Sequence, residues 1–325
     1  MAKKNKHDQR DVWDQVDPLE VYELESNLPK VRNLPRIKNK TSTGRLKSTD
    51  SEPLEDLGAE KDLDFTYMAS RHERTWIINS LEAFYKNRWI DDVLRVVKGG
   101  KEASVYQCAS NEFSQYEYIA AKIYRPRMFR SLRNDSLYRQ GRSHLDQNGN
   151  KIIDDGKLHA MRKGSRLGLE LTHQSWIAHE FATMQLLHSA GVDMPEPLAC
   201  GDNAILMAYI GSDVLPAPVL NAVNLEEEEA ISLFRRCIRN LEIMLKQNRI
   251  HGDYSAYNIL YWEGEIIVID FPQAIDPFEN PSARMIFDRD VLRICEYFKT
   301  QGVPSNPQKI AADLWQRHGH QEITE

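Results

Sequence analysis

The stretch of sequence that decides the fold reads His251-Gly252-Asp253-Tyr254-Ser255-Ala256-Tyr257-Asn258-Ile259-Leu260. It is followed by an apolar run at 266–269 and then by Asp270. Phosphoryl transfer uses this arrangement, because one Asp orients the attacking hydroxyl while the Asn and a second Asp after a strand hold the metal on the phosphates. A lone His-Gly-Asp also occurs as a turn with a satisfied carboxylate. The second Asp at the expected spacing favours a nucleotide site.

Two charged residues upstream supply the partners that such a site needs. Lys122 lies in the apolar run Ala-Ala-Lys-Ile-Tyr at 120–124, where an unpaired ammonium would be costly to bury. Glu180, in the next predicted helix, is its expected partner. A Lys–Glu pair of this kind orients the α- and β-phosphates in protein kinases. The alternative is that Lys122 extends to solvent.

A glycine-containing turn, Lys-Gly-Gly-Lys-Glu-Ala-Ser-Val at 98–105, lies between the first two predicted strands. Kinases place the loop that covers the phosphates at this point. The turn does not follow the G-x-G-x-x-G spacing, so it is a weak signal when taken alone.

The chain divides into a polar tail and an ordered part. Residues 1–62 are rich in charged and small polar residues, and we expect a disordered charged tail because they cannot bury enough apolar surface. An amphipathic helix follows, with Ile77, Leu81 and Phe84 at helical spacing. Three β-type runs at 92–97, 103–108 and 116–124 predict an antiparallel meander.

The rest of the chain reads as a long loop and a mostly helical region. Residues 126–172 show no sustained period and predict a flexible loop. We expect helices at 176–190, at about 226–245 with Asn224 as its cap, at 283–300 and at 307–318, and strands at 204–210 and 265–270.

Composition excludes several classes of protein. The 325 residues are 41% hydrophobic and 28% charged, which is ordinary for a globular chain. No apolar run approaches the roughly 20 residues of a membrane span, and the charged N-terminus does not resemble a signal peptide. The four cysteines are far apart and form no C-x-x-C pair, which argues against a zinc site or a disulfide framework. We expect a reduced, cytoplasmic protein without a membrane partner.

The net charge of −6 is unevenly distributed. Residues 125–166 carry eleven Lys or Arg against four Asp or Glu. A basic strip on an acidic protein indicates an anionic partner such as phosphate or RNA, although a solvated loop would have the same composition.

These motifs together resemble the RIO family of atypical protein kinases over residues 95–303. The resemblance rests on six segments: Gly-Gly-Lys-Glu-Ala-Ser-Val-Tyr at 99–106, Ala-Lys-Ile-Tyr at 121–124, Ala-Gly-Val-Asp-Met-Pro-Glu-Pro at 190–197, Leu-Pro-Ala-Pro at 215–218, the 251–260 stretch and Ile-Asp-Phe-Pro-Gln-Ala at 269–274. The Leu-Pro-Ala-Pro segment and the arginines after Lys122 are similar to the first RIO subfamily, whereas Asp-Phe-Pro-Gln is more similar to the second, and the first subfamily is the better match.

The resemblance implies an α+β, two-lobed kinase-like fold without an activation loop or peptide-docking helices. The helix and N-lobe would occupy 63–210, and the C-lobe 211–325. It implies ATP and Mg²⁺ as cofactors, with Mn²⁺ as an alternative ion, and a protein substrate or autophosphorylation. It also implies a role in small-ribosomal-subunit maturation, with RNA or the subunit bound through the basic strip at 125–166.

The same resemblance assigns the site residues. Asp253 and Asp270 would be catalytic, with Asp270 as a phosphate acceptor, and Asn258 and Asp270 would bind the metal. The backbone of Ala208 and Ile210 would bind adenine, although Ala208 replaces the usual acidic residue. The complete set implied for ATP is Lys101, Glu102, Ala103, Val105, Lys122, Glu180, Met207, Ala208 and Ile210.

Two functions of other classes stay open at this point. A small-molecule phosphotransferase similar to aminoglycoside or choline kinases shares His-Gly-Asp, a downstream Asn and an Ile-Asp-Phe strand. An idle ribosome-binding scaffold would need none of the charged residues, yet all of them are present.

Overall fold

A computed structural model describes residues 63–100, 102–112, 114–125, 137–138, 140–146 and 149–318. The tail predicted at 1–62 and Lys101, which the resemblance assigns to ATP, lie outside the described residues. The chain forms two compact units: one includes Met68–Asn79, and the other comprises Leu63–Tyr67 and the chain from Ser80 onward. Every described residue of the candidate site belongs to the second unit. The predicted leading helix is α2 (Arg71–Lys86).

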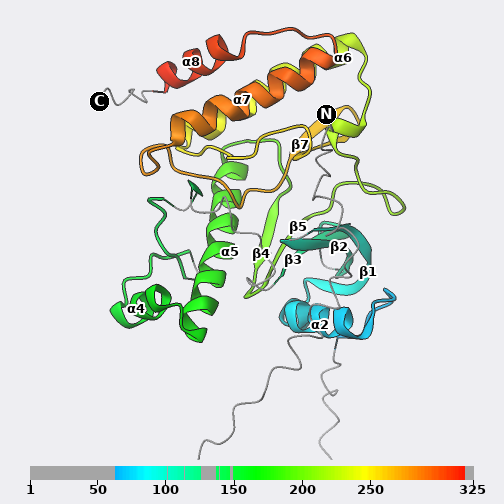
Figure 1. Ribbon diagram of the computed structural model, residues 1–325. Coiled ribbons are helices and arrows are strands. Elements are labelled where there is room, and N and C mark those ends of the chain that lie inside the picture. Colours follow the sequence, from blue (N-terminus) through cyan, green and yellow to red (C-terminus); the bar gives the residue numbers. More distant parts are fainter. Residues whose placement is uncertain are drawn as a thin grey trace, which may run out of the picture. The chain divides into compact units, whose positions relative to one another are not determined.

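The N-lobe is a five-stranded antiparallel sheet in the order β1-β2-β3-β5-β4 (Figure 1). Its strands are β1 (Ile90–Gly99), β2 (Ala103–Ser110), β3 (Tyr118–Tyr124), β4 (Pro197–Cys200) and β5 (Ala204–Ala208). The predicted three-stranded meander is confirmed by β1, β2 and β3. Sequence reasoning missed β4, because its four residues are all half-buried and show no alternation. Lys122 lies on the central strand β3, opposite Val105 and Ile205.

The helix that carries Glu180 is α5 (Arg166–Ser189). The prediction of a helix at 176–190 was wrong at its start, because the first turns are mostly exposed and show no apolar period. Ser165 caps α5 by accepting a hydrogen bond from the backbone N–H of Gly168 at 3.1 Å. Figure 1 shows α5 as the long helix beside the sheet.

The predicted loop at 126–172 contains helical segments that could not be predicted from its sequence. Helix α4 (Asp155–Lys163) has no fully buried residue and only three half-buried ones, Leu158, Ala160 and Met161, so its apolar face is too small to show a helical period. Both ends of the helix are capped. At the N-terminus the Asp154 carboxylate accepts the Lys157 N–H, and at the C-terminus Gly164 adopts the left-handed conformation. The interpretation of this whole segment as a loop is therefore corrected.

The C-lobe is mostly helical. It contains η3 (Leu220–Ala222), α6 (Glu227–Lys246), the hairpin β6 (Ile259–Trp262) and β7 (Glu265–Val268), α7 (Ala283–Thr300) and α8 (Pro307–Arg317). The predicted α7 and α8 are confirmed. Asn224 does not cap α6, since the helix begins after Glu226 and no side chain forms a capping bond there. Its acidic first turn matches the positive end of the helix dipole.

One apolar core joins the two lobes. Trp176, Ile177 and Met184 of α5 are buried in the same cluster as Leu241 of α6 and Ile294 of α7. This packing fixes the sheet and the C-lobe helices around the candidate site. None of the helices among the described residues has the length and apolarity to cross a membrane.

Candidate active site

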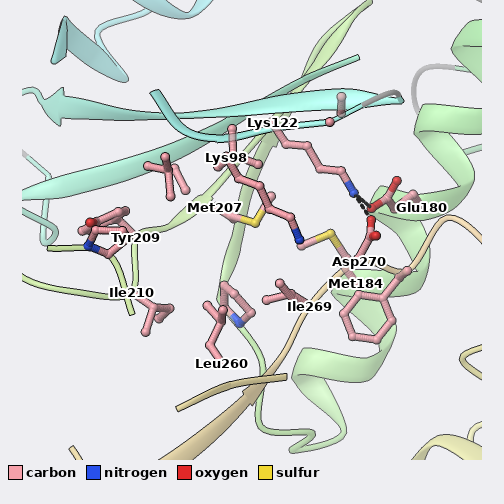
Figure 2. A pocket seen from close by; sticks show the side chains of 18 of the residues that line it. Lys98, Lys122, Glu180, Met184, Met207, Tyr209, Ile210, Leu260, Ile269 and Asp270 are labelled. Carbon is pink, nitrogen blue, oxygen red and sulfur yellow. Dashed lines mark hydrogen bonds and ion pairs between the residues drawn. The ribbon is translucent and has the colours of Figure 1, made fainter. Parts of the chain in front are cut away.

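A cavity of about 420 Å³ opens between the sheet and the C-lobe (Figure 2). Its volume lies in the range of ordinary small-molecule sites. The structure brings together around it all the described residues that the sequence assigned to ATP: Glu102, Ala103, Val105, Lys122, Glu180, Met207, Ala208 and Ile210, and also Asp270. Asp253 and Asn258 do not line this cavity.

Lys122 forms the ionic centre of the cavity. Its ammonium donates to Glu180 Oε1 at 2.7 Å and to Asp270 Oδ1 at 2.6 Å (Figure 2). Burial favours the neutral amine, but the two carboxylates outweigh it, so the pKa of Lys122 is raised and the side chain stays charged. The Tyr124 hydroxyl donates to Glu180 Oε2 at 2.8 Å, so both oxygens of this buried carboxylate have partners. Extension of Lys122 to solvent is thereby excluded.

Asp270 occupies an unusual backbone conformation. Strand β7 ends at Val268, so the predicted strand at 265–270 is two residues too long, and Asp270 follows it with φ of 72°. A non-glycine residue in this left-handed region costs roughly 1–3 kcal/mol, and residues strained in this way cluster at functional sites. Desolvation raises the pKa of Asp270, but Lys122 outweighs it, and the pKa lies below its ordinary value.

The 251–260 stretch, the candidate catalytic loop, is ordered by a neutral histidine. His251 is buried and its pKa is lowered by desolvation. The tautomer with the proton on Nε2 donates to the Ile269 carbonyl at 3.1 Å, while Nδ1 accepts the Asp253 N–H at 3.3 Å. The ring thus ties the loop that carries Asp253 to the residue before Asp270.

Asn258 connects the two halves of the motif. Its Nδ2 donates to Asp253 Oδ2 at 2.8 Å and to the Asp253 carbonyl at 2.9 Å. Its own carbonyl accepts the N–H of Ile269 at 2.9 Å, which places Asn258 beside the residue before Asp270. Asn258 Oδ1 and Asp270 Oδ2 make no hydrogen bond with the part of the chain that the structure describes. Both are oxygens of the kind that Mg²⁺ prefers, so the residues fit a metal bound together with phosphates.

Helix α7 also holds the 251–260 stretch in place. Asp290 is buried and accepts the Gly252 N–H at 2.8 Å, and desolvation raises its pKa to about 7. Arg289 donates to the Gly252 carbonyl and to Tyr138. Gly252 has φ of 83°, and a Cβ there would lie 2.4 Å from the Gln273 carbonyl, so no other residue fits. The loop therefore has little freedom to move.

Arg125 holds the loop that covers the cavity. Its guanidinium donates to the Gly100 carbonyl at 2.8 Å and to Ser104 Oγ at 3.4 Å, and its N–H donates to the Glu102 carbonyl at 2.8 Å. The sequence placed Arg125 in the basic strip. In the structure its guanidinium and its backbone N–H are bonded to the 100–104 loop, so Arg125 also fixes a loop that lines the cavity.

Sequence reasoning missed three polar side chains of the site. Tyr124 supports Glu180, and Arg293 pairs with Asp253 Oδ1 at 2.5 Å. Lys98 lines the cavity and extends into it (Figure 2), and it has no ion-pair partner among the described residues. Strand alternation could not have placed Lys98 on the cavity face, because β1 has a register shift between Val96 and Lys98 and the adjacent Val97 also lines the cavity. No local signal connects Arg293 with a residue 40 positions earlier.

The edge of the cavity at β5 presents backbone groups. The Ala208 N–H donates to the Glu196 carbonyl at 2.9 Å, and the Ile210 carbonyl accepts the Ala217 N–H at 3.0 Å. The Ala208 N–H and the Ile210 carbonyl therefore already have partners. The other backbone groups of these two residues, the Ala208 carbonyl and the Ile210 N–H, could form hydrogen bonds with an adenine ring.

Comparison with known proteins agrees with this geometry. The pattern of the RIO domain family matches residues 104–310. Thermoplasma acidophilum RIO-type serine/threonine-protein kinase Rio1 is 30% identical over 135 residues, which cover 42% of this chain and 69% of that protein. The human serine/threonine-protein kinase RIO1 is 24% identical over 286 residues, which cover 85% of this chain and 47% of the human protein.

A second archaeal relative gives the same assignment. The RIO-type serine/threonine-protein kinase Rio1 of Haloferax volcanii is 28% identical over 217 residues, or 66% of each chain. The match to the family pattern covers most of the described residues, including both Lys122 and Asp270. The chain therefore belongs to the RIO family and is a homologue of RIO-type serine/threonine-protein kinases.

Proposed function

We propose that this protein binds ATP in the cavity and transfers its γ-phosphoryl group to a serine or threonine hydroxyl, its own or that of a protein substrate. The observation that carries the proposal is the ion triad of Lys122 with Glu180 and Asp270 on the cavity wall. A charged ammonium held by two carboxylates has a fixed position and can orient phosphates. Membership of the RIO family supports the same reaction.

The nucleotide would be held at its two ends. Adenine would lie against Met207, with hydrogen bonds to the Ala208 carbonyl and the Ile210 N–H. The phosphates would lie under the loop that begins at Gly100, within reach of Lys122 and Lys98. Asn258 Oδ1 and Asp270 Oδ2 would hold Mg²⁺, or Mn²⁺, and the bound ion supplies charge neutralisation of the phosphate oxygens.

In the transfer to a hydroxyl, Asp253 has the central role. The hydroxyl oxygen forms a bond to the γ-phosphorus, the bond from that phosphorus to the β,γ-bridging oxygen breaks, and ADP leaves. Asp253 accepts the hydroxyl proton and later releases it to water. Its carboxylate is already oriented by Asn258.

Asp270 is a second acceptor for the same phosphoryl group. One carboxylate oxygen would attack the γ-phosphorus as ADP leaves, with no proton to transfer, and water would later hydrolyse the acyl phosphate. The strained φ and the bond to Lys122 hold this carboxylate in one position, which favours its attack. This route would give net ATP hydrolysis.

Labelling with γ-³²P ATP distinguishes the two acceptors. If Asp270 is phosphorylated, intact mass shows about one phosphoryl group on the protein, hydroxylamine removes it, and Asp270→Asn carries none of it. Label that survives hydroxylamine and stays in Asp270→Asn would instead place the phosphate on a hydroxyl residue. Asp288→Asn, which changes an exposed carboxylate of α7, is the matched control.

We infer further that the protein acts on the small ribosomal subunit through RNA. The described part of the basic strip contains the exposed residues Lys157, Arg162 and Lys163 on α4, a helix with no fully buried side chain. A helix that adds little to the core and presents a basic surface is suited to bind a polyanion.

Reversing the charge of these three residues tests that role. Binding of a labelled single-stranded RNA should weaken in the Lys157→Glu/Arg162→Glu/Lys163→Glu variant, and the slope of log K against log salt should fall by about 0.7 for each lost phosphate contact. The control changes three exposed cations elsewhere, Arg235, Lys246 and Lys309, to Glu. An equal effect in both variants would mean that only net charge matters.

A further inference from the structure

Arg293 forms an ion pair with the proposed catalytic carboxylate. It belongs to α7, one helical turn after Arg289, so the two arginines lie on the same face of the helix. Arg289 donates to the Gly252 carbonyl, and Arg293 Nη1 lies 2.5 Å from Asp253 Oδ1. Two consecutive turns of α7 thus contact two consecutive residues of the catalytic loop.

The pair completes the fixation of Asp253. Asn258 Nδ2 holds Oδ2 at 2.8 Å, and Arg293 holds Oδ1, so the carboxylate is bound at both oxygens. A carboxylate oxygen has two lone-pair sites, and Oδ1 can accept a substrate hydroxyl beside the guanidinium. Arg293 therefore does not block the position that the hydroxyl needs.

The charge of Arg293 addresses a specific difficulty of the reaction. The γ-phosphate of ATP is anionic, and it must approach a hydroxyl that is bound to the anionic Asp253. Repulsion between like charges at a few ångströms is substantial near a protein surface. A guanidinium in contact with Asp253 offsets this repulsion without removing the proton acceptor.

The remaining donors of Arg293 are available. Its Nε and Nη2 form no hydrogen bond with the residues that the structure describes, and its side chain is 39% exposed. A half-exposed ion pair contributes little to the stability of a fold. Its position against the proposed base is therefore better explained by the reaction than by folding.

We propose that Arg293 is a positioning residue for phosphoryl transfer, which fixes Asp253 and offsets its charge as the γ-phosphate approaches. The inference rests on the proposed function, because it needs Asp253 to act on a substrate hydroxyl. The residue acts on the transfer step and not on the binding of ATP, since it does not line the cavity.

The expected result is a split between turnover and binding. Arg293→Gln should lower kcat for phosphoryl transfer to a hydroxyl, counted as label on the protein that survives hydroxylamine, by about 10- to 100-fold. KM for ATP, the affinity for ATP and the melting temperature should stay near those of wild type. Arg293→Lys, which keeps the positive charge but lacks the planar set of guanidinium N–H donors, should recover part of kcat.

A double-mutant cycle shows whether Arg293 acts through Asp253. If it does, Asp253→Asn/Arg293→Gln should be no slower than Asp253→Asn alone. The control is Arg317→Gln, another exposed arginine that pairs with a carboxylate, Glu242, at 2.8 Å, and it should leave kcat unchanged.

The outcomes separate the inference from the function on which it rests. Unchanged or raised kcat in Arg293→Gln, in an active wild type, would overturn the role of Arg293 alone, and a rise would make the pair an inhibitory lock. Equal losses in the Gln and control variants would also overturn it. A wild type that binds ATP without breaking it down would overturn the proposed function, and the role of Arg293 with it.

Discussion

Replacement of Asp253 by Asn is expected to lower the rate of phosphoryl transfer to a hydroxyl, counted as label that survives hydroxylamine, by roughly 10²- to 10⁴-fold, because proton acceptance by a positioned side chain contributes about this factor. The Asn side chain keeps the shape of the carboxylate and one oxygen acceptor, but it cannot take the hydroxyl proton. Asp253 does not line the nucleotide cavity, so the affinity for ATP should change little. Single-turnover kinetics with γ-³²P ATP and titration with a fluorescent ATP analogue measure the two quantities.

The matched control for this prediction is Asp288→Asn. Asp288 is an exposed carboxylate on α7 that pairs with Arg284 at 2.9 Å. Among the described residues, no hydrogen bond or ion pair joins it to the 251–260 stretch. It should transfer phosphate at the wild-type rate. If Asp253→Asn keeps a rate within about threefold of wild type, the residue is not the proton acceptor.

Replacement of Lys122 by Met is expected to destabilise the protein by about 3–5 kcal/mol, since it removes one partner of a buried ion pair. Glu180 would remain almost fully buried, with its side chain 1% exposed and no counter-charge at Oε1. Asp270 would lose its bond to the ammonium as well, but that carboxylate faces the open cavity and can be hydrated. Chemical denaturation followed by circular dichroism measures the free energy of unfolding.

A second variant separates stability from function. In Lys122→Met/Glu180→Gln both charges of the buried pair are gone, and the amide oxygen can still accept the Tyr124 hydroxyl. Much of the lost stability should return, while the affinity for ATP stays low because no ammonium orients the phosphates. A Lys122→Met protein as stable as wild type would show that the triad is not the buried, coupled unit described above.

The sequence predicted the site better than it predicted the elements around it. Lys122, Glu180 and Asp270 lie far apart along the chain, yet each could be assigned, because a charge in an apolar run needs a partner and phosphoryl transfer needs a known set of groups. Their meeting at 2.6–2.7 Å confirms the predicted Lys–Glu pair and adds Asp270 to it. The bond between Lys122 and Asp270 was not foreseen.

The features that the sequence did not predict were missed for physical reasons. Helix α4 and the first turns of α5 bury little, and without an apolar face the helical period does not appear. The end of β7 was misplaced because the apolar run continues to Ile269, whereas the chain turns at Asp270 into the left-handed region. Arg293 was missed because only the tertiary structure brings α7 to the catalytic loop.

A separate observation argues against each of the two alternatives to a protein kinase. The match to the RIO domain over residues 104–310 argues against an aminoglycoside- or choline-kinase-like enzyme. The buried Lys122–Glu180 pair argues against an idle scaffold, because a buried ion pair is costly to keep without a use. A scaffold would bind RNA through α4 and leave ATP intact.

The most direct test of the central claim is incubation of the wild-type protein with γ-³²P ATP and Mg²⁺, with separation of labelled protein, inorganic phosphate and remaining ATP. We expect the γ-phosphoryl group to leave ATP and to appear on the protein, in solution as phosphate or on both, and Asp253→Asn/Asp270→Asn to stop this. Binding of ATP by the wild-type protein with the nucleotide intact after many hours would contradict the account.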